Sequence, residues 1–164
     1  MKLQNLVLFC MLLCYSIPLV YVYSNYYSNN SLSNIICDEN ITSIIFGSMT
    51  MMSVFTLYYE YLSDNITSLG IIGSLFIGIY GVILLPEYNP LHYVFAVLCF
   101  LSILGFMIYY CCILHDYILY SLTSLLIWVS LWILATFQQN IFYGEISFLA
   151  LFAAFYLYLH TLRI

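Results

Sequence analysis

Six long runs of apolar residues, separated by shorter polar stretches, dominate this chain. A helix that crosses the hydrocarbon core of a bilayer needs about 20 mostly apolar residues. The runs come close to that length or exceed it, and they do not show the alternation of a membrane β-barrel strand. They are Leu3–Tyr23, Ile44–Leu62, Leu69–Leu85, Leu91–Leu114, Tyr117–Phe137 and Ile146–Leu162. We therefore predict an all-α integral membrane protein, a bundle of six transmembrane helices with short loops.

The composition excludes most other classes of protein. Of the 164 residues, 65% are hydrophobic and 5% are charged, and the mean hydropathy is +1.05. A soluble domain carries about 25% charged residues, so this chain cannot cover a surface that faces water. An ordinary soluble enzyme, a nucleic-acid binder and a disordered tail are excluded. The six runs leave no room for a second domain, so we predict one polytopic domain over residues 1–164.

The two basic residues, Lys2 and Arg163, lie at opposite ends of the chain. Basic residues favour the cytoplasmic side of a membrane. If both are cytoplasmic, the number of spans is even, which agrees with six and places both termini in the cytoplasm. The first run has the shape of a signal peptide but lacks a clear cleavage site of small residues. We expect it to be retained as the first helix.

The longest polar stretch, residues 24–43, is then an outer loop on the luminal or extracellular side. It contains two N-glycosylation sequons, which begin at Asn29 and Asn40. We predict these two asparagines as possible glycosylation sites, with chance occurrence in an Asn-rich segment as the alternative. A third sequon begins at Asn65, in a tight turn on the inner side, and should stay unmodified.

All seven acidic residues map to loops or to the ends of the predicted helices, where water can hydrate them. They are Asp38, Glu39, Glu60, Asp64, Glu87, Asp116 and Glu145. Ionisable residues inside the membrane mark ion paths and proton relays, so this placement disfavours a pump, a voltage sensor or a proton-coupled transporter. Glu60 and Glu145 could turn inward, but we expect both to be hydrated at the interface.

We find no internal repeat of the kind that inverted-repeat transporters show.

The third run carries small residues at helical spacing. Small side chains let two membrane helices approach closely, and residues four apart share one face of a helix. We expect this helix to pack tightly inside the bundle, with a homodimer through the glycine face as the alternative. The small residues are Gly70, Gly73, Ser74, Gly78 and Gly81, and Ala150 and Ala154 form a weaker set on the last run.

Cys111 and Cys112 lie near the inner end of the fourth run, close to His115 and Asp116. Residues of these types can bind a metal at such spacings, and a juxtamembrane cysteine pair can be palmitoylated. We expect plain packing, with palmitoylation of the two cysteines as an alternative and no metal site.

Chemistry that would indicate an enzyme is scarce. His92 lies on the outer side, whereas His115 and His160 lie on the inner side, so the three histidines cannot converge on one metal. We find no nucleophile elbow, zinc motif or phosphate-binding loop in the sequence. We predict no catalytic residues, no cofactor and no enzymatic activity.

Three segments carry a resemblance to a known family. The first joins Ser16–Val20, before the outer loop, to Ile45–Met49 after it, and the second is Leu69–Phe76 followed by His92. The third runs from Gly144–Phe148 through Tyr156–Leu159 to Arg163. In these patterns the chain resembles the damage-regulated autophagy modulator family, six-helix endomembrane proteins related to factors of GPI-anchor lipid remodelling.

The resemblance implies a non-enzymatic protein of the lysosome, Golgi or endoplasmic reticulum that modulates autophagy or lipid trafficking, with membrane lipid as its partner. The residues that match the family by position would serve packing first and ligand contact second. They are Gly47, Gly70, Gly73, His92, Glu145 and Arg163.

Two alternatives stay open. One is a structural membrane protein, either of a viral envelope or as a small subunit of a larger complex, which would contact other membrane proteins. The other is an enzyme or accessory factor that acts on lipid anchors, for which His92, Glu87 and Glu145 are the outer-side candidates. Neither alternative involves nucleic acid.

Overall fold

The computed structural model describes residues 3–24, 39–86, 88–136 and 141–163, and within these residues the ordered elements are all helices. The prediction of an all-α fold is confirmed. The helices are α1 (Leu3–Ser24), α3 (Glu39–Leu62), α4 (Ile66–Leu84), α5 (Pro90–Leu114), α6 (Tyr117–Ala135) and α7 (Ile141–Arg163).

Polar residues at the turns define where three helices begin. The side chain of Asn65 accepts a hydrogen bond from the amide of Ser68 and caps α4. Asn89 caps α5 in the same way, with Pro90 directly after it in the first turn. Asp116 accepts hydrogen bonds from the amides of Ile118 and Leu119 at the start of α6. Such residues satisfy amides that have no partner within the helix.

Two helices begin five residues earlier than their apolar runs. Helix α3 begins at Glu39 rather than at residue 44, and α7 begins at Ile141 rather than at residue 146. The predicted bounds were wrong here because hydropathy marks only the apolar part of a helix, whereas the backbone hydrogen bonds continue into polar residues. The predicted outer loop, residues 24–43, therefore ends before Glu39 rather than at residue 43.

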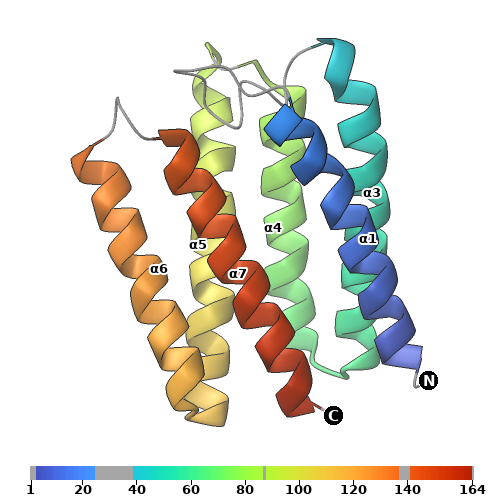
Figure 1. The fold of residues 1–164 in the computed structure, drawn as a ribbon, viewed down its shortest axis with the longest axis vertical. Coiled ribbons are helices and arrows are strands. Elements are labelled where there is room, and N and C mark those ends of the chain that lie inside the picture. The colour runs from blue at the N-terminus through green and yellow to red at the C-terminus, as the bar shows by residue number, and fades with distance from the viewer. Residues whose placement is uncertain (1–2, 25–38, 87, 137–140, 164) are drawn as a thin grey trace.

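The helices form two layers of three and alternate in direction along the chain (Figure 1). Helices α6, α7 and α1 form one layer, and α5, α4 and α3 form the other. Helix α1 begins and α7 ends at the same end of the bundle. Within the described residues, α7 packs closely against α6 but its backbone stays away from that of α1.

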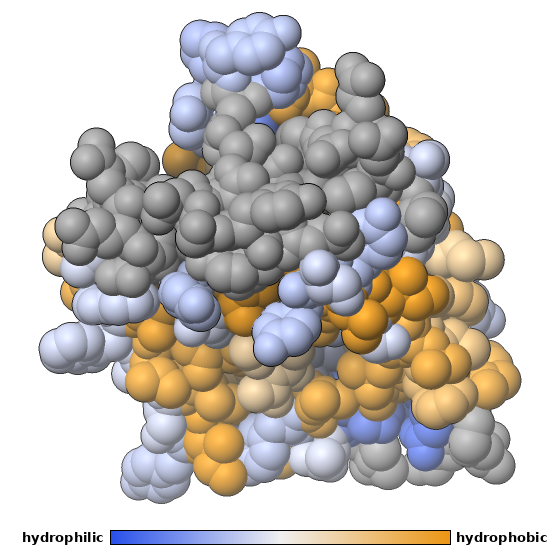
Figure 2. Space-filling view, turned by 45° about the horizontal axis from the view of Figure 1, so that its top comes forward, coloured by the Kyte–Doolittle hydropathy of each residue, from blue (hydrophilic) through white to orange (hydrophobic). Residues whose placement is uncertain are grey.

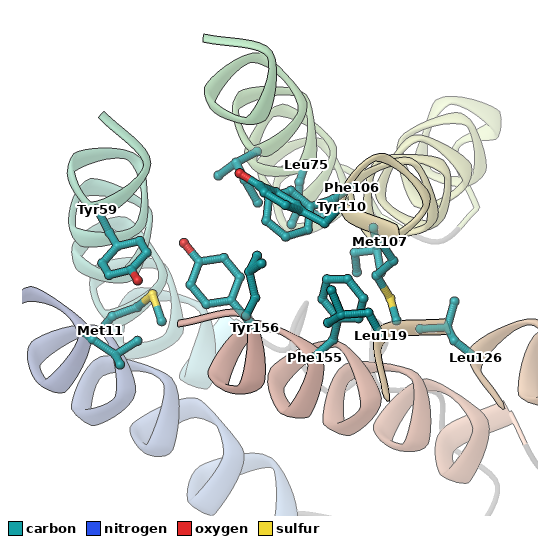
Figure 3. Close-up of a cluster of buried hydrophobic side chains, with 14 of the residues drawn as sticks. Met11, Tyr59, Leu75, Phe106, Met107, Tyr110, Leu119, Leu126, Phe155 and Tyr156 are labelled. Carbon is teal, nitrogen blue, oxygen red and sulfur yellow. The ribbon is translucent and has the colours of Figure 1, made fainter. Parts of the chain in front are cut away.

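Aromatic and aliphatic side chains from each of the described helices pack together between the layers. Figure 3 shows part of this core, with Tyr156 of α7 between Tyr59 of α3 and the pair Phe106 and Tyr110 of α5. The ring of Tyr156 stacks on that of Phe106, with centroids 5.6 Å apart. Such pairs stabilise a fold by about 0.5–1.5 kcal/mol beyond the area that they bury.

The small residues of α4 divide into two groups. A Cβ atom on Gly78 would lie 2.7 Å from the sulfur of Cys99 and 3.0 Å from the backbone oxygen of Phe95, so only glycine lets α5 approach this closely. Gly81 faces the ring of Phe95 in the same way.

The close packing that we predicted for Gly70 and Gly73 is wrong, because nothing lies within 4 Å of a Cβ atom built on either. The hydroxyl of Ser74 turns back to the carbonyl of Gly70. Ala150 and Ala154 are exposed on the outer face of α7, so they do not pack in the bundle either. The face of a helix that packs depends on its neighbours, which the spacing of small residues does not reveal.

The outside of the bundle is largely apolar. Figure 2 shows apolar side chains across the middle of one face, with hydrophilic ones nearer its edges. Four helices are long and apolar enough to cross a membrane, namely Leu3–Ser24, Ile66–Leu84, Pro90–Leu114 and Tyr143–Arg163. They indicate a membrane protein. A shorter apolar helix covers Tyr117–Trp132.

Candidate functional site

A buried cluster of polar side chains joins four helices at the end of the bundle where α7 ends. We call it the polar cluster and define it as Glu60 of α3, Ser68 of α4, Tyr110 of α5, and Tyr156 and Arg163 of α7. Glu60 lies in the last turn of α3, and its side chain is 0% exposed. An isolated carboxylate in that position would be very costly, so its partners decide whether the fold tolerates it.

Glu60 accepts four hydrogen bonds. Arg163 binds both carboxylate oxygens, with Nη1 3.0 Å from Oε1 and Nη2 3.0 Å from Oε2. The hydroxyl of Tyr156 donates to Oε1 and that of Ser68 donates to Oε2. Two parallel bonds between a guanidinium and a carboxylate form the strongest type of ion-pair geometry. The buried charge is therefore neutralised and its hydrogen-bonding capacity is used.

Three tyrosine rings surround the guanidinium of Arg163. Its central carbon lies 4.7 Å from the ring centre of Tyr110, 5.5 Å from that of Tyr59 and 6.0 Å from that of Tyr156. Arg163 also donates to the hydroxyl of Tyr110. Cations over aromatic faces gain about 0.5–2 kcal/mol, more where water is excluded. The rings thus shield the ion pair and add to its stability.

Asn65 extends the network to the turn between α3 and α4. Its amide nitrogen donates to the hydroxyl of Tyr110 at 3.3 Å, and its oxygen accepts from the hydroxyl of Tyr109 at 3.0 Å. On the opposite side, the hydroxyl of Tyr59 forms a hydrogen bond with Nδ1 of His160. The network connects the ends of α3, α4, α5 and α7, and the amide of Asn65 is committed to it.

The expectation that Glu60 is hydrated at the interface was wrong. The acidic residue turns inward because Arg163 meets it there, 103 positions along the chain. The sequence offered one signal for this pair: Glu60 and Arg163 both end a predicted helix on the inner side. The apolar runs did not show the rotation of either helix, so the signal did not single out the pair.

An apolar cavity of about 140 Å³ lies between the two layers. Side chains of α1, α3, α4, α5 and α7 line it, among them Met11, Met52, Ile72, Phe76, Ile103 and Phe152. Tyr156 belongs to both sites, because its ring lines the cavity while its hydroxyl binds Glu60. Apolar cavities of this size stay dry and accept apolar ligands.

A second cavity of about 140 Å³ adjoins the first, between α3, α4, α5 and α7. Its lining is also mainly apolar, with Ala96, Phe100 and Phe148 among the residues. Glu145 lines it as well and is half-buried. The structure therefore places this glutamate, which we expected at the interface, beside an apolar space.

The other predicted residues lie apart from these sites. His92 is buried, and its Nδ1 lies 2.8 Å from the carbonyl oxygen of Leu85, so it ties the start of α5 to the end of α4. Cys111 is buried and contacts the hydroxyl of Thr123, whereas Cys112 is exposed. Among the described residues, no three His, Cys, Asp or Glu side chains group as metal ligands would. Palmitoylation of Cys111 and Cys112 stays a prediction.

The glycosylation sites also stay predictions. Asn29 lies outside the described residues, and so does Glu87. Asn40 lies in the first turn of α3, and its side chain is not among those described.

Comparison with known proteins identifies no relative: no family model, no curated protein and no solved structure matches the chain.

Proposed function

We propose that this chain is a six-span membrane protein that binds the acyl chain of a membrane lipid in its apolar cavities and is not an enzyme. The observation that carries the proposal is the cavity between the layers, lined by apolar side chains from five helices. Ligand sites are typically concave and mostly apolar. In a bilayer, lipid chains are the apolar molecules present at high concentration.

Lipid could reach the cavities from the side. Leu157 of α7 lines the first cavity and is 39% exposed, and Phe100 of α5 lines the second and is 37% exposed. Both side chains thus contact the inside and the outside of the bundle. Helices α1 and α7, which flank the first cavity, do not pack backbone against backbone in the described residues.

The absence of an enzymatic role is proposed from the polar cluster. Glu60 is the buried carboxylate of this site, but Arg163 and the hydroxyls of Tyr156 and Ser68 occupy its oxygens. Such a pair serves to fix helices rather than to transfer protons.

We propose the endomembrane setting, with a role in autophagy, lysosomal function or lipid trafficking, from the family resemblance.

The test is the intact mass of the purified chain in mild detergent, compared with a variant whose cavity is filled. Ala153 lines the cavity, and Ala154 beside it is exposed. We expect the unchanged chain and Ala154→Phe to retain a lipid of defined mass, and Ala153→Phe to lose it. The proposal would be contradicted if Ala153→Phe retained the lipid, or if the protein without substitutions carried none.

A structural role in an envelope or a larger complex is the second candidate. The observation that favours it is the polar cluster, whose hydrogen bonds join the ends of four helices. A folded chain without lipid in the same experiment would favour this role.

A further inference from the structure

The two cavities adjoin and share part of their lining. Five residues line both of them: Met49 of α3, Ile79 of α4, Cys99 and Ile103 of α5, and Leu149 of α7. A ligand in one cavity therefore contacts side chains that also line the other. We call the combined space the channel.

The channel has the length of one lipid chain. Along α7 its lining extends from Glu145 to Leu157. At a rise of 1.5 Å per residue this segment spans about 18 Å. Half of the hydrocarbon core of a bilayer is about 15 Å, so the lining is as long as the acyl chain of a lipid in one leaflet.

The two ends of the channel differ in chemistry. At one end lie Thr56 and Tyr156, whose hydroxyls donate to the carbonyl of Met52 and to Glu60. Because both hydroxyls already donate hydrogen bonds within the protein, that end of the channel is suited to the methyl end of an acyl chain. At the other end lies Glu145, the one charged side chain among the described residues that line the channel.

The charge of Glu145 determines which headgroup fits. A half-buried carboxylate beside an apolar space gains from a cation and repels an anion. An ionised carboxylate has about four lone-pair sites, so a headgroup can bind Glu145 beside its contacts within the protein.

We propose that the channel selects lipids whose headgroup carries an ammonium group, which Glu145 binds while one acyl chain fills the channel towards Tyr156. This inference rests on the proposed function, because it specifies the headgroup of the lipid that the cavities hold.

The test uses two lysolipids with the same acyl chain. One has an ethanolamine headgroup, which ends in an ammonium group, and the other has a glycerol headgroup, which has no cation and leaves the lipid anionic. The purified chain is mixed with equal amounts of both, and the bound lipid is identified from the intact mass of the complex. The variants are Glu145→Gln and, as a matched loss of one negative charge elsewhere, the exposed Asp64→Asn.

We expect the unchanged chain and Asp64→Asn to bind the ethanolamine lysolipid at least tenfold in preference. Glu145→Gln should bind both lysolipids about equally. Equal binding of both lysolipids by the unchanged protein would overturn the headgroup proposal, and so would an unaltered preference in Glu145→Gln. Either result would leave the proposed binding of an acyl chain intact. Binding of neither lysolipid by a folded chain would contradict the proposed function itself.

Discussion

At the scale of single residues, stability at one end of the bundle depends on Glu60. Its carboxylate is fully buried, yet four hydrogen bonds and one guanidinium compensate for the lost hydration. Removing one partner of such a pair leaves a buried charge alone, which costs about 3–5 kcal/mol, whereas replacing both is much less costly.

We predict that Glu60→Gln lowers the free energy of unfolding by about 3 kcal/mol, because the guanidinium of Arg163 loses its counter-charge. Combining it with Arg163→Gln should cost clearly less than the sum of the two single changes. Chemical unfolding in mild detergent, followed by circular dichroism, measures this coupling.

The control is Asp64→Asn, which removes an exposed carboxylate four residues away and should change stability by no more than about 0.5 kcal/mol. Additive single and double changes would show that the ion pair does not couple α3 to α7.

The sequence could not reveal this residue's role. Hydropathy showed that Glu60 ends an apolar run, but a run that is apolar on all sides does not indicate which way its last turn faces. The partner, Arg163, lies 103 positions away. The pairing results from the tertiary fold, which no local pattern encodes.

At the scale of helices, α4 and α5 form the closest pair, and glycine makes that approach possible. Gly78 faces the backbone of Phe95 and Cys99 on α5, and backbone atoms cannot move aside as a flexible side chain can. Gly70, two turns earlier on the same helix, has open space beside it.

Gly78→Ala should therefore destabilise the chain by about 1–3 kcal/mol, the usual cost of overpacking. Gly70→Ala should leave stability unchanged or raise it slightly, because alanine favours a helix. The same unfolding measurement compares the two variants. Equal effects of the two substitutions would mean that α4 does not pack on α5 through Gly78.

The helices themselves were largely predictable, since each of the six apolar runs corresponds to a helix among the described residues. What hydropathy could not supply was their full length and their packing faces. Helices α3 and α7 continue through polar residues such as Glu39 and Glu145, and α4 packs through Gly78 and Gly81 but not through Gly70 or Gly73.

At the scale of the whole molecule, the two layers enclose a channel that the sequence did not indicate. Its lining comes from five helices, with Met11, Met52 and Tyr156 among residues far apart in the chain. The apolar runs did not indicate that the backbone of α7 stands apart from that of α1 in the described residues. Helices α1 and α7 both line the first cavity, from which lipid binding is proposed.

Photo-cross-linking tests the proposed lipid site most directly. The protein is reconstituted in vesicles that contain a lipid with a diazirine at the end of one acyl chain. The protein is then purified in mild detergent and irradiated. We predict adducts on residues that line the channel, such as Met52, Phe152 and Tyr156. Adducts confined to exposed residues of α6, such as Leu125, Trp128 and Leu131, would contradict the account.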